Sequence, residues 1–223
     1  MKQIVFYFNY ICKINFIKIM LKYIIIIISF NSLLAQSTNI NNAFEHLKNN
    51  KYNEAINLFN NFIERNEAVS TFYYGRGVAY LYLNEYENAI KDFEKTISID
   101  KNYIDAYYGL VVININLKDY KTAKTLVNKA INIDSNYPNY YELFYVKGVL
   151  NYLLEDYKGA LKDFNYILDN KNSLNSLYGR AITHYKLQQL LDAKNDINSF
   201  LQNNKTENML MEECRRLLNI IHN

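Results

Sequence analysis

The residues best suited to acid–base or metal chemistry are few and far apart in this sequence. The three histidines are His46, His184 and His222. They fall in the first repeat unit, the fifth repeat unit and the C-terminal tail, so they lie too far apart to share a metal ion. The sequence has no His-Glu-x-x-His motif, Walker loop, dinucleotide fingerprint or Gly-x-Ser-x-Gly elbow. Because no acid, base and nucleophile converge, we predict that the protein is not an enzyme and needs no cofactor or metal.

The two cysteines offer no disulfide framework. Cys12 lies in the N-terminal segment and Cys214 lies near the C-terminus. If the N-terminal segment is removed, Cys214 is left alone and cannot form an intramolecular disulfide or a cysteine metal cluster. A free cysteine usually behaves as a small hydrophobic residue. We therefore expect Cys214 to be a core residue.

The composition is that of a folded, helical protein without a cationic surface. Half of the residues are hydrophobic, 21% are charged, and the chain has only six glycines and one proline. The formal net charge is +3, but residues 1–35 carry four lysines and no acid, so 21 basic and 22 acidic residues remain in the rest. This near-neutral body argues against binding to nucleic acid or anionic lipid.

The N-terminal segment has the layout of a secretory signal. Residues 21–37 read LKYIIIIISFNSLLAQS, which places a lysine before an apolar run and a small residue, Ala35, after it. The run is short for a membrane-spanning helix. We expect cleavage after Ala35 and export of the body to the cell envelope or beyond, with either Met1 or Met20 as the start. The alternative is that residues 20–35 stay as an uncleaved membrane anchor.

Internal repeats of about 34 residues follow this segment. Five columns of residues keep one register, with an alanine column spaced 34, 34, 37 and 33 residues apart. The alanines are Ala55, Ala89, Ala123, Ala160 and Ala193. Large side chains precede them by three residues at Tyr52, Tyr86, Tyr120, Tyr157 and Leu190. Apolar residues follow them by four at Phe59, Phe93, Val127, Phe164 and Ile197. Such spacing predicts an amphipathic second helix in each unit.

A second helical stretch precedes each of these segments, so each unit reads as helix, short turn, helix. One such hairpin cannot bury its own apolar face, and stacking of neighbouring units must supply the core. Lys91 and Asp92, echoed by Lys162 and Asp163, are interpreted as a recurring solvent face of the second helix.

These columns resemble those of the tetratricopeptide repeat family. The matching residues are Tyr73, Gly77, Tyr80, Ala89, Phe93, Ala123 and Ala130, with Phe144 and Gly148 matching in part. The proline that usually ends each unit is missing except for Pro138, which lies in the one lengthened junction. The resemblance implies an all-α fold, a right-handed α-solenoid of about five helix–turn–helix repeats. The expected boundaries are 1–35 for the signal and 36–69, 70–103, 104–140, 141–173 and 174–207 for the repeats.

Residues 208–223 are predicted to form a capping helix. Its apolar face would be made by Leu210, Cys214, Leu217, Leu218 and Ile221, and its charged face by Glu212, Glu213, Arg215 and Arg216.

The resemblance also implies a concave groove lined by the first helices, where partners dock. A tyrosine column that keeps the repeat spacing would point toward this groove, and tyrosine combines a large contact area with a polar tip. Our predicted partner-binding residues are Tyr74, Tyr108, Tyr145, Tyr178, Tyr152 and Tyr185. An aliphatic column, Val78, Val112, Val149 and Ile182, either extends the furrow or packs between units. We expect a furrow with few charges. Tyrosine and valine occupy the positions where a carboxylate clamp would need lysine and asparagine.

The predicted function is that of a non-catalytic adaptor that binds a partner polypeptide. One alternative is a membrane-tethered scaffold or homo-oligomer, which an uncleaved leader would favour. Another is a helical repeat that binds RNA, which the near-neutral body and the predicted export disfavour. The partner and the oligomeric state cannot be read from the sequence.

Overall fold

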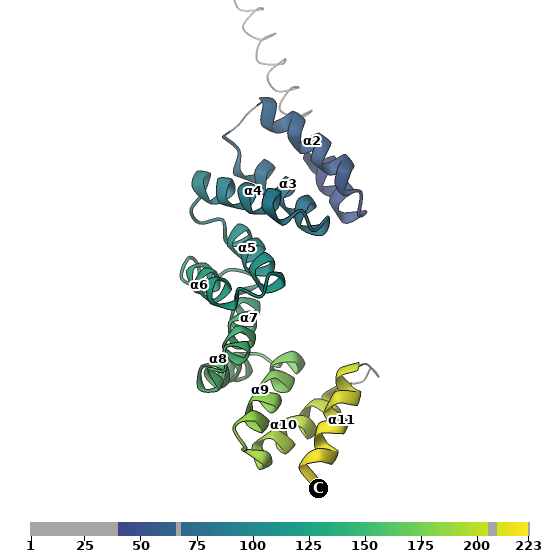
Figure 1. Cartoon of the computed structure of the whole chain (residues 1–223), viewed down its shortest axis with the longest axis vertical. Coiled ribbons are helices and arrows are strands. Elements are labelled where there is room, and N and C mark those ends of the chain that lie inside the picture. Colours follow the sequence, from purple (N-terminus) through teal and green to yellow (C-terminus); the bar gives the residue numbers. More distant parts are fainter. Residues whose placement is uncertain (1–39, 66–67, 205–208, 223) are drawn as a thin grey trace, which may run out of the picture. The chain divides into compact units, whose positions relative to one another are not determined.

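The structure is a computed structural model that describes residues 40–65, 68–204 and 209–222. Within these ranges the ordered elements are helices and no strand occurs (Figure 1). The predicted signal and its cleavage site lie outside the described residues. No helix within the described ranges is long and apolar enough to cross a membrane. Residues 40–65 belong to one compact unit, and the ranges from 68 onward belong to a second.

The first unit contains a helical segment over residues 40–48 and helix α2 (Tyr52–Arg65). Ala43 and Ala55 are fully buried, as is Phe59. The ring of Phe44 meets the ring of Phe59 edge-on with 5.3 Å between centroids. The predicted alanine and aromatic columns thus form the core of this helical pair.

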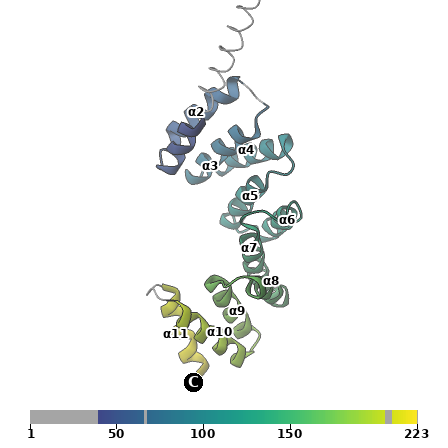
Figure 2. The same ribbon diagram turned by 180° about the vertical axis from the view of Figure 1, so that it is seen from behind.

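The described residues of the second unit form four helical hairpins and a final helix. The hairpins are α3 (Ser70–Tyr82) with α4 (Tyr86–Ile99), α5 (Ile104–Asn116) with α6 (Tyr120–Ile131), α7 (Tyr140–Leu153) with α8 (Tyr157–Asn170), and α9 (Leu174–Lys186) with α10 (Leu190–Asn203). The final helix is α11 (Met209–His222). Each hairpin packs against the next, through α4 on α5, α6 on α7 and α8 on α9 (Figure 2). The predicted consecutive helix–turn–helix repeats are confirmed.

Each hairpin turn places one residue in the left-handed region of backbone space. The residues with positive φ are Asn50, Asn84, Lys118, Glu155 and Gln188, and none of them is glycine. At the α3–α4 turn the amide of Glu85 donates to the carbonyl of Tyr80, and the amide of Asn84 donates to that of Leu81. This pair of bonds is the Schellman ending of a helix. The same ending recurs in all five turns, which is why turns of three residues suffice between the two helices of each hairpin.

The repeat columns form the core of the second unit. Ala89, Ala123, Ala160 and Ala193 are fully buried, so the two helices of each hairpin approach closely. The apolar residues four positions later, Phe93, Val127, Phe164 and Ile197, are at most 1% exposed. The packing role that the sequence predicted for both columns is confirmed.

The interpretation of Asp92 and Asp163 as solvent-facing residues was wrong. Lys91 is exposed, but Asp92 is only 4% exposed and accepts hydrogen bonds from Arg76 Nε and Nη2 at 2.8 and 2.7 Å. Asp163 is 2% exposed and is paired with Lys147 Nζ at 2.8 Å. In each case the partner lies on the first helix, sixteen residues earlier in the chain.

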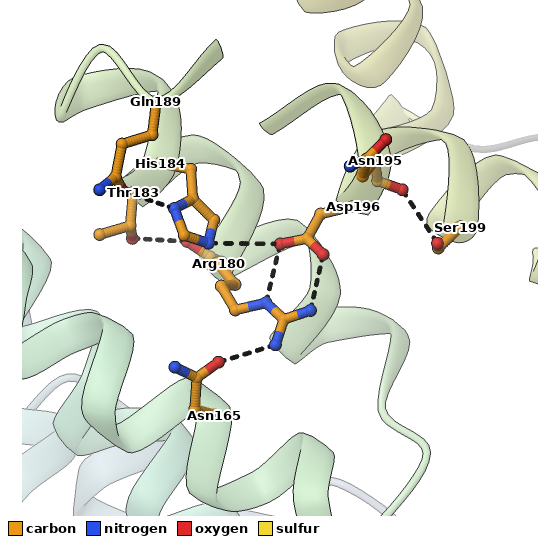
Figure 3. A network of polar contacts seen from close by, with 9 residues as sticks. Asn165, Arg180, Thr183, His184, Gln189, Asn195, Asp196 and Ser199 are labelled. Carbon is orange, nitrogen blue, oxygen red and sulfur yellow. Dashed lines mark hydrogen bonds and ion pairs between the residues drawn. The ribbon is translucent and has the colours of Figure 1, made fainter. Parts of the chain in front are cut away.

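The third such pair extends into a small network. Arg180 donates from Nε and Nη2 to the carboxylate of Asp196 at 2.8 and 2.7 Å, and from Nη1 to Asn165 of the preceding hairpin at 2.7 Å (Figure 3). His184 lies between Asp196, 3.9 Å from its Nε2, and Gln189, 2.7 Å from its Nδ1. The histidine is thus part of the packing between α9 and α10. The α5–α6 hairpin has Leu110 and Leu126 at the two corresponding positions, and both lie in one apolar cluster.

Helix α11 covers the end of the last hairpin. Met211 and Cys214 are buried and pack with Phe200 of α10, while Leu217 and Leu218 are half-buried against the same cluster. Burial raises the pKa of the Cys214 thiol to about 11. The prediction that Cys214 is a core residue is confirmed. Glu212, Glu213, Arg215 and Arg216 are exposed, as expected for the outer face of a cap.

Candidate functional site

The tyrosine column lies on the first helices of the four hairpins, one tyrosine on each of α3, α5, α7 and α9. Tyr74, Tyr108, Tyr145 and Tyr178 are all half-buried rather than fully exposed. Three of their rings pack against buried phenylalanines of the second helices: Tyr74 on Phe93, Tyr145 on Phe164 and Tyr178 on Phe200, with centroids 6.0, 6.1 and 6.2 Å apart. Each of these three tyrosines thus rests on the core, which fixes the position of its ring.

Two cavities open along this column. The first, which we call the tyrosine–valine cavity, has a volume of about 440 Å³ and lies between α3 and α5. Its walls include Tyr74, Val78, Leu81, Tyr108 and Val112. Side chains from the tyrosine and aliphatic columns therefore line it together. The half-buried Val78 also packs against the core cluster around Phe93, so it serves the core and the cavity at once.

The second cavity, which we call the acidic cavity, has a volume of about 420 Å³ and lies beside the lengthened junction between α6 and α7. Its walls include Asp105, Tyr108, Tyr137, Tyr141, Glu142 and Tyr145. Asp105 and Tyr108 line both cavities, so the two adjoin along the column. We call the two cavities together the groove. Of the six predicted binding residues, Tyr74, Tyr108 and Tyr145 line the groove, whereas Tyr178, Tyr152 and Tyr185 line neither cavity.

The acidic residues Asp105 and Glu142 were missed by the sequence analysis, which expected few charges in this furrow. Each precedes a groove tyrosine by three residues, a spacing that puts both on one face of the helix. The repeats could have revealed these acids, because the position three residues before each tyrosine of the column is polar in every hairpin. It holds Thr71, Asp105, Glu142 and Asn175. The expectation of a furrow with few charges is therefore corrected, because Asp105 lines both cavities and Glu142 lines the acidic one.

Burial and these carboxylates shape the electrostatics of the groove. Burial is the main cause of the raised pKa of Tyr108 and of Tyr145, and the negative charge of Glu142 adds to both shifts. The Tyr137 hydroxyl donates a hydrogen bond to Asp105, and burial together with this bond raises the pKa of Tyr137 to about 12. Both effects extend the pH range over which these phenols stay neutral and able to donate hydrogen bonds to well above neutral pH.

The groove offers binding groups rather than reacting groups. Its polar groups are phenol and serine hydroxyls, asparagine amides, carboxylates and the ammonium group of Lys171. Within the described part of the chain, no cluster of histidine, cysteine, aspartate and glutamate could hold a metal ion. A cavity of about 300–1,000 Å³ with apolar walls and a few fixed polar groups is typical of a ligand site. The groove as built can take up side chains of a bound molecule.

Comparisons with known proteins point to one repeat type. Family models described as tetratricopeptide repeat match residues 70–103 and 104–137, which contain the α3–α4 and α5–α6 hairpins. No curated protein sequence matches the chain significantly.

Among solved structures, the chain is similar to YrrB, described as a TPR protein with an unusual peptide-binding site. The identity is 21%, the match covers 74% of this chain and 81% of that one, and the TM-score is 0.62. It is also similar to PilW, a type IV pilus biogenesis factor, with 16% identity, coverages of 82% and 86% and a TM-score of 0.70. A third similar structure is pilF of Pseudomonas aeruginosa, with 15% identity, coverages of 83% and 87% and a TM-score of 0.69. At these identities the likeness shows a shared fold.

Proposed function

Because the chain belongs to the tetratricopeptide repeat family, we propose that it is a non-catalytic adaptor that binds a segment of another protein in the groove along α3, α5 and α7. We propose further that the adaptor works outside the cytoplasm, after export directed by its N-terminal segment.

The observation that carries the binding proposal is the pair of adjoining cavities. They lie between the first helices of successive hairpins and share the wall formed by Tyr108. Their volumes of about 440 and 420 Å³ are large enough to take up side chains of a bound segment. Rigid tyrosine rings lose little conformational entropy when they contact a partner, which makes them effective binding residues. A solved protein of similar fold is described as having a peptide-binding site, which supports a polypeptide as the ligand class.

Support for export comes from the sequence of the N-terminal segment. Lys22, the apolar run after it and Ala35 follow the order of a secretory signal. The alternative is a scaffold tethered to the membrane by residues 20–35, and the two differ in whether the mature chain starts at Gln36.

The test combines capture of the partner with sequencing of the mature N-terminus. The tagged chain is expressed in its native host, and the proteins it retains are compared between envelope and soluble fractions. We expect a chain that begins at Gln36 and one protein retained in stoichiometric amount. An intact leader without a retained partner would favour the tethered scaffold.

Substitutions then locate the binding surface. Serine in place of Tyr74, Tyr108 and Tyr145 together should abolish capture while the helical circular dichroism signal persists. The matched control replaces Tyr86, Tyr120 and Tyr157, which begin the second helices and line neither cavity of the groove. If the triple groove variant loses helicity, Tyr108→Ser alone gives the same test, since Tyr108 lines both cavities. Capture that survives in a folded groove variant would exclude the groove as the site.

A further inference from the structure

The acidic cavity combines two features that separately recognise a positive charge. Four tyrosines, Tyr108, Tyr137, Tyr141 and Tyr145, contribute to its walls, and two carboxylates, Asp105 and Glu142, lie among them. The face of an aromatic ring attracts an ammonium or guanidinium group, and this attraction grows when the cation is partly removed from water. A carboxylate beside the ring adds a direct ionic partner for the same group.

The carboxylates face the cavity because of their place in the repeat. Asp105 and Tyr108 are neighbours on α5, and Glu142 and Tyr145 are neighbours on α7, three residues apart in each case. The charge of Glu142 raises the pKa of Tyr145 on its own helix and also that of Tyr108 on α5. Its field therefore reaches across the cavity between the two helices.

Neither carboxylate is neutralised within the part of the chain that the structure describes. The ion pairs formed there involve Asp92, Asp156, Asp163, Asp196 and Glu45 as the acidic partners. The side chain of Asp105 accepts a hydrogen bond from the neutral hydroxyl of Tyr137. The one basic residue among the described ones that line this cavity, Lys171, places its Nζ 6.0 Å from the centre of the Tyr141 ring instead of pairing with Asp105 or Glu142. This contact also shows that an ammonium group is accommodated against a ring of this cavity.

We propose that the acidic cavity binds a lysine or arginine side chain of the partner segment. This inference rests on the proposed function, because it assigns the chemistry of the ligand at the same groove. The basic side chain lies between the tyrosine rings and is held by Asp105 and Glu142. An apolar neighbour of that residue in the partner enters the tyrosine–valine cavity and contacts Val78, Leu81 and Val112, while Asp105 at the boundary of the two cavities faces the basic side chain. Acidic segments and free C-terminal carboxylates are repelled.

The experiment begins with an unbiased selection. A library of short random peptides displayed on phage is selected against the immobilised full chain, and the sequences retained are compared with the starting library. We expect enrichment of lysine or arginine next to apolar residues. A synthetic peptide with the most enriched sequence, and its counterpart with glutamine at the basic position, then serve as probes in fluorescence anisotropy.

The matching protein variant is Asp105→Asn with Glu142→Gln, which removes both charges and preserves the size of the side chains. We expect the variant to bind the basic peptide with an affinity lower by about tenfold or more, and tenfold corresponds to about 1.4 kcal/mol. The glutamine peptide should bind the variant and the unmodified chain equally. The control variant, Glu87→Gln with Glu94→Gln, removes two exposed charges from α4, which does not line the acidic cavity. It should bind the basic peptide as the unmodified chain does.

Two other outcomes would overturn the inference, and they can be told apart. If the selected peptides show no excess of basic residues, or the charge-free variant binds them unchanged, while the triple tyrosine variant loses them, then the groove binds peptides but not through a cation. If the selection enriches no peptide, or no enriched peptide binds the full chain in fluorescence anisotropy, the proposed peptide-binding function fails as well.

Discussion

The ring of Phe164 occupies the space that any side chain at Gly179 would need. A methyl group at Gly179 on α9 would lie 2.6 Å from Cζ of Phe164, and one at Gly148 on α7 would lie 2.8 Å from its Cε1. One buried ring is therefore enclosed by glycines from two successive first helices. The same arrangement holds Phe93 between Gly77 and Gly109. The glycines of the first helices thus permit close stacking between hairpins.

We expect Gly179→Ala to destabilise the protein by about 1–3 kcal/mol, the usual cost of overpacking a well-filled core. Alanine favours a helix over glycine by up to about 1 kcal/mol, which offsets part of the loss. Phe164 is 1% exposed and its ring is also close to Gly148 on its other side, so a shift away from Gly179 meets a second helix. Urea denaturation followed by circular dichroism measures the change. With Phe164→Leu already present, Gly179→Ala should cost much less, and equal costs in both backgrounds would contradict this account of the packing.

The sequence predicted the columns whose role depends on local spacing. Ala89 and Phe93 lie four residues apart on one helix face, so periodicity alone indicated that both are buried. Asp92 was misassigned because its burial depends on Arg76, which lies on another helix. Local helical periodicity does not reveal such a partner. The constant spacing of sixteen residues in Arg76–Asp92, Lys147–Asp163 and Arg180–Asp196 was the available signal.

The position of the cavities could be read from the sequence only in part. The tyrosine column lies on the first helices, three of which contribute its members to cavity walls, but which members do so depends on the junctions between hairpins. The longest junction, residues 132–139, carries Tyr137 to Asp105 and helps to form the acidic cavity. Repeat spacing located this insertion without showing the cavity beside it.

The buried ion pairs provide the second prediction. In Arg76–Asp92 the side chains are 20% and 6% exposed, and the α5–α6 hairpin has Leu110 and Leu126 at these positions. Arg76→Leu alone should destabilise by about 3 kcal/mol, because it leaves a buried carboxylate without its cation. Arg76→Leu with Asp92→Leu should restore stability to within about 1 kcal/mol of the unmodified protein, since well-packed apolar residues often replace a buried pair without loss.

A thermodynamic cycle of the two single variants and the double variant, measured by urea denaturation, tests this prediction. A double variant as unstable as Arg76→Leu would show that the α3–α4 hairpin cannot accommodate the pair of leucines that the α5–α6 hairpin has at these positions.

The third prediction concerns the hairpin turns. Glu155 has φ of 62° and Asn84 has φ of 59°, a region in which a Cβ atom is costly, although asparagine tolerates it better than glutamate. Glu155→Gly should therefore stabilise the protein by about 0.5–1 kcal/mol, because removal of the strain exceeds the entropy cost of glycine. Asn84→Gly should have a smaller effect. Glu155→Ala, which keeps the Cβ atom, is the control, and a gain for alanine equal to that for glycine would refute the explanation.

The fourth prediction is a loss of stability at high pH that depends on Tyr137. Burial and the hydrogen bond to Asp105 raise its pKa from 10.0 to about 12 in the folded protein. Between pH 10 and 12 the folded protein retains the proton of the Tyr137 phenol, whereas the unfolded chain has lost it. The contribution of this phenol to the free energy of unfolding is therefore complete below about pH 10 and is lost as the pH rises toward 12. Other groove phenols, including Tyr108 and Tyr145, also have raised pKa values, so the unmodified protein should weaken steadily over this range.

Tyr137→Phe removes the contribution of this one phenol. The free energy of unfolding, measured by urea denaturation at several pH values from about 8 to 12, should fall less steeply for the variant than for the unmodified protein. Asp105→Asn keeps an acceptor for the hydroxyl but removes the negative charge, so it should also flatten the decline, by a smaller amount. Parallel curves for the unmodified protein and Tyr137→Phe would mean that the phenol of Tyr137 titrates alike in the folded and unfolded states. In that case its contact with Asp105 would not hold the proton, and the wall of the acidic cavity would be more open to water than the structure indicates.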